Sequence, residues 1–172
     1  MQHIVSTKSL SRLWRQLTFI PILHNRWLTD DLRASLTEAI TQVERGHRGE
    51  IYLVIENHLP IAQAYRTGCR ERALDLFGLH RVWDTAENTG VMIYLNVCEH
   101  DLEVIADRGI DSCVNEALWQ ALTDKALARC QAGHFAEALL GLIQDIGELL
   151  AQHYPDDDIS GNELANEVVF LR

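Results

Sequence analysis

Two short runs of β-branched and aromatic residues, separated by a helical stretch, constrain the fold of this 172-residue chain more than any other feature. The first run is Glu50–Ile55, which lies between Gly49 and Pro60. The second, Val91–Val97, is almost entirely apolar, as expected of a strand covered on both faces. Because the intervening residues Ala62–Phe77 repeat with helical spacing, we expect a crossover helix that makes the two strands parallel.

A third strand is expected at Leu102–Asp107, because so short a connection to the second run makes the two strands antiparallel neighbours. Helical periodicity covers much of the remaining chain. The predicted helices are an amphipathic one containing Leu10, Leu13, Trp14 and Leu17, one from the N-cap Thr29 to Gly46, and two at Asn115–Gln131 and His134–His153. This order predicts an α/β fold, a three-layer α/β/α sandwich with a small mixed sheet flanked by helices.

The chain divides into three parts by composition. Residues 1–27 are predicted to form a basic, amphipathic helical arm, residues 28–154 one α/β domain, and residues 155–172 an acidic, loosely structured tail. Part of the tail, Asp156–Glu167, partly matches a calcium-binding loop. We interpret the match as coincidence, because Glu163 stands where such a loop needs an apolar residue and too few residues follow Glu167 for an exiting helix.

The charge of the chain excludes some partners. Lys and Arg number 15 against 25 Asp and Glu, and the net charge of −10 repels phosphate backbones, so we expect no nucleic acid partner. The first 28 residues contain no acid. Their basic residues are Lys8, Arg12, Arg15 and Arg26. We expect this arm to dock on the acidic domain through Leu13, Trp14 and Leu17; peripheral membrane contact through residues 1–27 is the alternative.

Several features favour a cytoplasmic protein. No apolar run approaches the ~18 residues that cross a bilayer, so no transmembrane segment is expected. Residues 1–7 lack the apolar core of a signal peptide. The four cysteines, Cys69, Cys98, Cys113 and Cys130, form no C-x-x-C pair and are expected to be core thiols in a reducing compartment.

Acidic and amide side chains are predicted to gather at one end of the sheet. Asp84, Glu87 and Asn88 precede the second strand, and Asp107 ends the third, which runs back to the same end. Carboxylate and amide oxygens are ligands that Ca²⁺ and Mg²⁺ prefer, so these four residues form a candidate metal site. The alternative is structural: Asp107 pairs with Arg108 or Arg81, and Asp84 caps a turn.

The common catalytic signatures are missing from the sequence, and we assign no catalytic residue. There is no Gly-rich nucleotide loop, H-E-x-x-H, G-x-S-x-G or C-x5-R. His100 is interpreted as a solvated turn residue rather than a general base, because it stands beside Glu99 and Asp101 in a tight turn. Trp83 and Trp119 are expected to be core anchors.

The segment from about Leu28 to Leu150 resembles the TPM domain. The matching pieces are Gly49–Ile51, Arg70–Ala73, Val82–Thr85 with Asn88 and Gly90–Val91, Ala106–Ile110 and Gly133–Phe135. The tail piece Asn162–Leu164 is similar to the ending of a small bacterial soluble subfamily. The resemblance implies an α/β/α fold, divalent-cation binding in some members and an acid phosphatase activity in the plant branch, with Asp84 and Asp107 as the matching acids.

Two functions follow from these observations. The first is a noncatalytic accessory or binding domain that takes a divalent cation and an unidentified protein partner. The second is a weak, divalent-metal-dependent acid phosphatase, in which Asp84 and Asp107 hold the cation. The missing nucleophile and base favour the first.

Overall fold

The computed structural model describes residues 10–20, 26–155 and 163–171, which form seven helices and one four-stranded sheet. The strands are β1 (Glu50–Glu56), β2 (Gly90–Asn96), β3 (Asp101–Ala106) and β4 (Val169–Leu171), in the order β3-β2-β1-β4. β2 pairs in parallel with β1 and antiparallel with β3, as the sequence predicts. The sheet is therefore mixed, with β1 and β2 at its centre.

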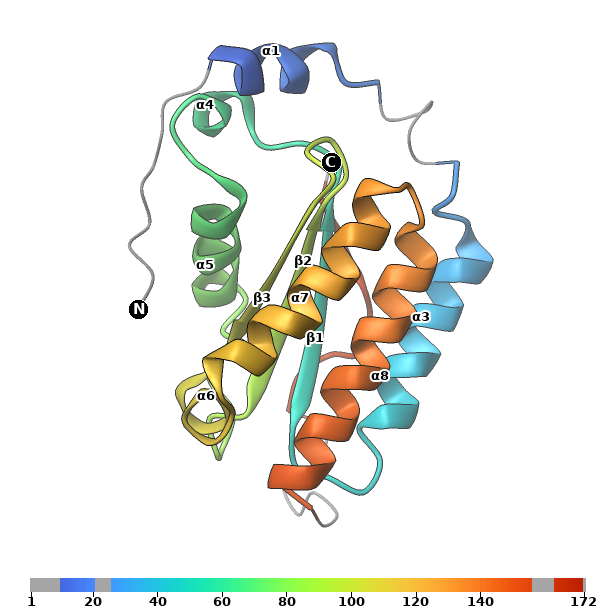
Figure 1. Ribbon diagram of the computed structural model, residues 1–172, viewed down its shortest axis with the longest axis vertical. Coiled ribbons are helices and arrows are strands. Elements are labelled where there is room, and N and C mark those ends of the chain that lie inside the picture. Colours follow the sequence, from blue (N-terminus) through green and yellow to red (C-terminus); the bar gives the residue numbers. More distant parts are fainter. Residues whose placement is uncertain (1–9, 21–25, 156–162, 172) are drawn as a thin grey trace.

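Helices cover both faces of the sheet, which confirms the three-layer prediction (Figure 1). Three helices lie on one face: α3 (Asp30–Val43), α7 (Glu116–Gln131) and α8 (Phe135–His153). On the opposite face lies α5 (Cys69–Leu79). Alternate residues of the central strands serve the two layers: Leu53 packs with the three-helix layer and Val54 with α5.

Side-chain caps fix where the long helices begin. The Thr29 hydroxyl accepts the N–H of Leu32 at the start of α3, and the Asn115 side chain accepts the N–H of Ala117 at the start of α7. The prediction of a single crossover helix over Ala62–Phe77 is wrong. It is divided into α4 (Ile61–Ala64) and α5, because Gly68 begins a new helix in which Glu71 accepts the Gly68 N–H.

The N-terminal helix α1 (Leu10–Thr18) lies across one end of the molecule, next to α4 (Figure 1). Its predicted orientation is wrong for Trp14 and Leu17, whereas Leu13 is half-buried. Trp14 and Leu17 are exposed, whereas Gln16 is buried with 3% of its surface accessible. The helix thus contacts the domain through its polar side. Lys8 and part of the following linker lie outside the described residues.

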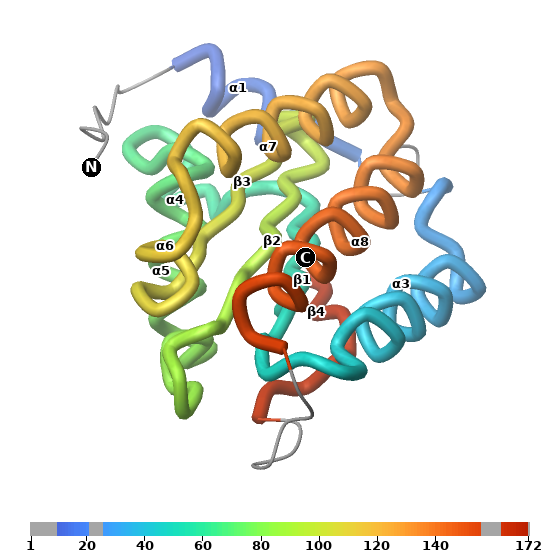
Figure 2. The backbone as a smooth tube through the Cα atoms, turned by 60° about the horizontal axis from the view of Figure 1, so that its bottom comes forward, coloured from blue at the N-terminus to red at the C-terminus, as the bar shows by residue number. Residues whose placement is uncertain are grey.

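The C-terminal tail is more ordered than its composition predicts. Residues 169–171 form β4, which lies beside the end of β1 (Figure 2) and pairs with it in parallel. The N–H of Asn57 donates to the Leu171 carbonyl. The prediction of a loosely structured tail is therefore wrong for this segment. Most of the partial calcium-loop match, residues 156–162, lies outside the described residues.

The cysteines are free thiols, and three of the four are buried as predicted. The prediction of a core position is wrong for Cys113, which is exposed. Burial, together with the charge of Glu99, raises the pKa of Cys98 to about 11. Burial likewise raises the pKa of Cys130 to about 12, so both remain protonated, apolar core groups at neutral pH. No helix in the described part of the chain is long and apolar enough to span a bilayer.

Candidate functional site

The backbone brings Asn88 and Asp107 together at the end of the sheet where β2 begins. Asp107 follows β3 and caps α6 (Arg108–Cys113), since its Oδ1 accepts the N–H of Arg108 at 2.7 Å. Asn88 adopts a left-handed conformation with φ 57°, and its carbonyl accepts the N–H groups of Gly109 and Ile110 at 3.0 and 3.3 Å. The loop before β2 is thereby fixed against the start of α6.

Gly109 makes this close approach possible. A Cβ atom at that position would collide with the carbonyl oxygens of Glu87 and Asn88. Two threonines hold the loop from the other side: the Thr85 hydroxyl accepts the N–H of Thr89 at 2.9 Å, and the Thr89 hydroxyl donates to the Arg48 carbonyl at 2.9 Å. The segment 84–89 is therefore a rigid support for its polar side chains.

Arginines pair with three of the four predicted metal ligands. Asp84 forms an ion pair with Arg81, and Glu87 forms one with Arg48 at 2.5 Å. The Asn88 side-chain oxygen accepts the Nε–H of Arg108 at 3.0 Å. The alternative to a metal site was that Asp107 pairs with Arg108 or Arg81 and that Asp84 caps a turn. The structure instead pairs Asp84 with Arg81, and Asp107 accepts a backbone N–H.

The second carboxylate oxygen of Asp107 has no hydrogen-bond partner among the residues that the structure describes. Asp107 is 8% exposed, and its Oδ2 is buried without a hydrogen bond. A buried, unpaired carboxylate oxygen is costly and therefore marks a position that a cation or another donor would stabilise. Within the described residues, no three acidic, histidine or cysteine side chains converge in a metal-binding arrangement. The four predicted ligands lie at one end of the sheet, but they do not form a complete coordination site.

The C-terminal tail reaches this end as well. The carboxylate of Glu50, at the start of β1, accepts the N–H groups of Glu163 and Leu164 at 3.0 and 3.3 Å. In turn, the Glu163 carboxylate accepts the N–H of Ala86 at 3.0 Å. Sequence reasoning missed both acids as contacts. The signal available for Glu50 was a charged residue at the start of a strand buried along its length.

Trp83 presents an exposed aromatic surface beside this loop, so the prediction that it anchors the core is wrong. Trp83 is 46% exposed, and the guanidinium of Arg81 lies 5.9 Å from the centroid of its ring. The neighbouring Leu79 is 72% exposed. Trp119, by contrast, is buried against the three-helix layer, as predicted.

A second polar cluster lies at the opposite end of the sheet and was missed by sequence reasoning. We call it the Glu56 network; it consists of Glu56, Arg72, Tyr94 and Asn96. Arg72 Nη2 lies 2.7 Å from Glu56 Oε1, the Tyr94 hydroxyl donates to Glu56 Oε2 at 2.6 Å, and the Asn96 amide donates to the Tyr94 oxygen at 3.0 Å.

The Glu56 network is buried and internally satisfied. Glu56 is 1% exposed, and burial, reinforced by the charge of Glu56, raises the pKa of Tyr94 above its ordinary value. Tyr94 therefore remains a protonated donor. Since each of these contacts lies between side chains of the network itself, its chemistry is structural, and it fixes the carboxyl ends of β1 and β2.

Comparison with known proteins identifies the fold. A family model described as the TPM domain matches residues 24–149. The NMR structure of the BA42 protein from the psychrophilic bacterium Bizionia argentinensis is similar, with a TM-score of 0.73 and 24% identity over 83% of this chain and 94% of that one. The N-terminal domain of a P. gingivalis protein is similar with a TM-score of 0.61 and 13% identity, over 75% and 82%. None of the curated proteins matches this chain.

Proposed function

The chain belongs to the TPM domain family, and from that premise we propose that it is a noncatalytic binding module. It takes a protein partner through the exposed surface around Trp83, and a divalent cation, Ca²⁺ or Mg²⁺, beside Asp107. We place it in the cytoplasm, a proposal that its four free thiols favour. The observation that carries the proposal is the exposed Trp83 directly before the rigid segment 84–89.

The partner surface consists of Leu79, Arg81, Trp83 and Asp84. Two large apolar side chains stand exposed here, next to an ion pair whose members are 68% and 48% exposed. Tryptophan and arginine are the residue types that most often dominate the binding energy of an interface. The rigid attachment of the loop lowers the entropy lost on binding. A partner with an apolar pocket flanked by polar groups fits this surface.

A photo-reactive phenylalanine analogue placed at position 83 tests the surface in the native cell. We expect one discrete covalent adduct at this position and none at Asp124, an exposed site on α7. The purified adduct partner should then bind the wild-type chain and lose at least about tenfold in affinity with Trp83→Ala, as expected of an interface hot spot. Equal affinity of the two proteins would reject the surface.

The cation proposal rests on Asp107, whose Oδ2 is buried and unpaired. Asp107 and Asn88 would hold the ion together with Glu87 and Asp84, once these two carboxylates leave Arg48 and Arg81. The donor set, three carboxylates and one amide, fits the hard-oxygen preference of Ca²⁺ and Mg²⁺. Because two arginine ion pairs and the hydrogen bond from Arg108 to Asn88 must open, we expect the binding to be weak.

Calorimetric titration with CaCl₂ and MgCl₂ tests the cation site. Asp107→Asn should abolish the binding heat of the wild type together with the rise in melting temperature that the ion produces. The matched control is Asp145→Asn, which removes an acid paired with Lys125 between α7 and α8. Cation binding that survives Asp107→Asn would exclude this site.

The second candidate function is a weak metal-dependent phosphatase. It is favoured by the guanidinium groups of Arg48 and Arg108, which lie at the same end of the sheet as Asp107 and fit a phosphoryl group. A bound cation would polarise a phosphoryl oxygen there. Hydrolysis of an aryl phosphate that requires a divalent ion and disappears in both Arg48→Gln and Asp107→Asn would favour the enzyme over the binding module.

A further inference from the structure

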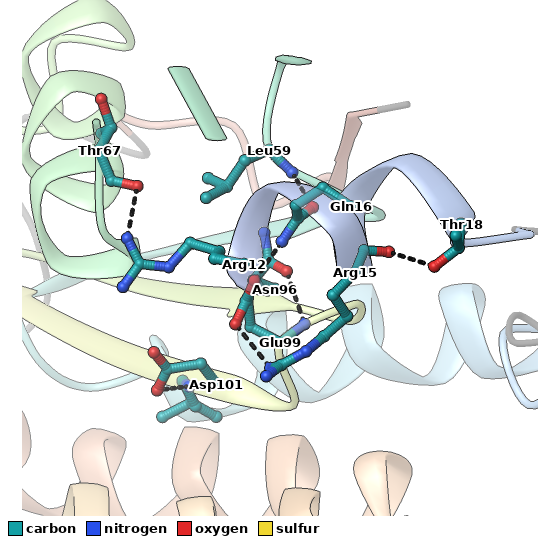
Figure 3. Close-up of polar contacts among 10 residues, drawn as sticks. Arg12, Arg15, Gln16, Thr18, Leu59, Thr67, Asn96, Glu99 and Asp101 are labelled. Atoms are coloured by element: carbon teal, nitrogen blue, oxygen red, sulfur yellow. Dashed lines mark hydrogen bonds and ion pairs between the residues drawn. The ribbon is translucent and has the colours of Figure 1, made fainter. Parts of the chain in front are cut away.

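The helix α1 contacts the domain through its polar side, which is unusual for an amphipathic helix. The Gln16 side chain accepts the N–H of Leu59 at 2.8 Å and donates to the Glu99 carboxylate (Figure 3). Arg15 forms an ion pair with the same carboxylate at 2.8 Å, and Arg12 donates to the Thr67 carbonyl at 3.3 Å. Figure 3 shows all three side chains directed from the helix toward the domain.

These contacts continue into the core. The N–H of Glu99 donates to the Asn96 side-chain oxygen at 3.0 Å, and Asn96 belongs to the buried Glu56 network. The Gln16 amide is thus one end of a hydrogen-bonded path that begins at Arg72 on α5. Such a path fixes the rotation of the helix about its own axis, so the orientation of α1 is set by specific contacts with the domain.

The opposite side of the helix is apolar and has no cover in the described structure. Leu10, Trp14 and Leu17 follow one another at helical spacing and are 73%, 70% and 51% exposed. Ile20 after the helix and Ile61 on the adjacent α4 are 52% and 58% exposed. We call these five residues the outer apolar face. Few apolar patches of this kind occur on monomers without a binding role.

The charge around this face identifies its occupant. The two segments that carry this face, residues 10–20 and 57–68, contain Arg12, Arg15 and Arg66 and no acidic residue, in a chain whose net charge is −10. Two acids at this end, Glu99 and Asp101, come from the β2–β3 connection and the start of β3, on the domain side of the helix. The Arg15 side chain as a whole remains 54% exposed despite its ion pair. An apolar helix face containing tryptophan and flanked by arginines is typical of helices that lie in the headgroup region of an anionic bilayer.

We propose that α1 attaches this protein to the surface of an anionic membrane, with the outer apolar face inserted among the lipid headgroups and the polar side of the helix still bound to the domain. The attachment needs no unfolding, because the two sides of the helix serve different contacts. It leaves the loop that precedes β2 at the end of the sheet farther from α1 (Figure 1), where it faces the aqueous phase. The inference goes beyond the binding function proposed above and does not depend on it.

Flotation of the full chain with lipid vesicles tests the proposal. We expect the wild type to float with vesicles of phosphatidylcholine and phosphatidylglycerol and to remain unbound with phosphatidylcholine alone. The double variant Leu10→Gln/Trp14→Gln should lose at least about tenfold in partitioning to the anionic vesicles. The matched control is Leu74→Gln/Leu118→Gln, which removes two exposed apolar residues from α5 and α7 and should bind like the wild type.

Four results would overturn the proposal. The first is a failure of the folded wild type to bind anionic vesicles. The second is equal binding to neutral vesicles, which would exclude the role of the arginines. The third is an equal loss of binding in both double variants. The fourth is a wild-type dimer, detected by sedimentation, that dissociates in Leu10→Gln/Trp14→Gln, since a second copy would then cover the face. Circular dichroism and thermal melting verify that both variants remain folded.

Discussion

The two ends of the sheet use the same side chains, carboxylates and arginines, in opposite ways. At the α1 end, Glu56 and Arg72 form a pair in which the two side chains are 2% and 14% exposed. At the other end, the paired side chains of Arg81 and Asp84 are 68% and 48% exposed. A buried pair is held in one arrangement because removal of either partner leaves a buried charge without its ion pair. An exposed pair exchanges partners at little cost, which is what a binding surface needs.

The largest expected effect distinguishes these two kinds of pair. Arg72→Leu leaves the Glu56 carboxylate buried without its cation and should lower the free energy of unfolding by about 3–5 kcal/mol. Arg81→Leu, the matched change at the exposed end, should lower it by less than about 1 kcal/mol. Urea denaturation measures both. Similar losses in the two variants would contradict the distinction between the ends.

The second prediction concerns the tight backbone contact at the loop end. Gly109→Ala places a Cβ against two backbone carbonyl oxygens, which have little freedom to move, and should destabilise the protein by about 3 kcal/mol. Gly78→Ala in α5 is the control. Nothing lies near its Cβ position, and alanine there should stabilise the helix by up to about 1 kcal/mol. Thermal melting of both variants gives the comparison, and a Gly109→Ala protein as stable as the wild type would show that the loop is not rigid.

The third prediction compares two adjacent residues of α1. Gln16→Ala removes the partner of the buried Leu59 N–H and should cost about 1–3 kcal/mol. Leu17→Ala removes a side chain that is half exposed and should change stability by less than about 0.5 kcal/mol. Chemical denaturation decides between the two orientations of the helix. A greater loss for Leu17→Ala would mean that the apolar side docks on the domain.

The smallest predicted effect is a pH dependence at the loop end. Burial raises the pKa of Glu44 from its ordinary value of 4.5 to about 8, although its Oε1 accepts the N–H of Ile51. The native state therefore binds a proton that the unfolded state releases above pH 4.5. This contribution to stability is complete below pH 4.5 and is lost as the pH rises to about 8.

Between pH 6 and pH 7 the loss amounts to at most about 1.4 kcal/mol, the limit for one proton. Urea denaturation across this range measures it. Glu44→Gln, which carries no titratable proton, should show a flatter dependence. A variant with the same slope as the wild type would assign the effect to another group.

The apolar pattern predicted most of the fold because burial of whole strands and helix faces is a local property of sequence. The parallel pairing of β1 with β2 followed from that pattern, and the residue type of Thr29 predicted its cap. The rotation of α1 did not. Periodicity shows which residues share a face, but it does not show which face docks. The contacts of Gln16 to Leu59 and Glu99 join residues far apart in the chain.

The sequence predicted that the candidate residues lie at one end of the sheet, but it did not predict which side chains they contact. Strand direction sufficed to bring Asn88 and Asp107 to the same end of the sheet. Which arginine meets which acid depends on the reach of long side chains from other segments, as with Arg48 and Glu87, and no local pattern encodes it. Trp83 was assigned to the core because aromatic residues usually lie there, although it belongs to a turn whose following acid faces solvent.

The pairing of β4 with β1 also bears on how the chain is made. β1 leaves the ribosome long before Val169–Leu171 is synthesised, so its outer edge carries unpaired backbone groups during most of translation. The same edge reopens whenever the last strand is lost by proteolysis. Residues 169–171 therefore close this edge only after the rest of the domain has been made, and a β-prone peptide that reached Val54–Glu56 first would occupy their place.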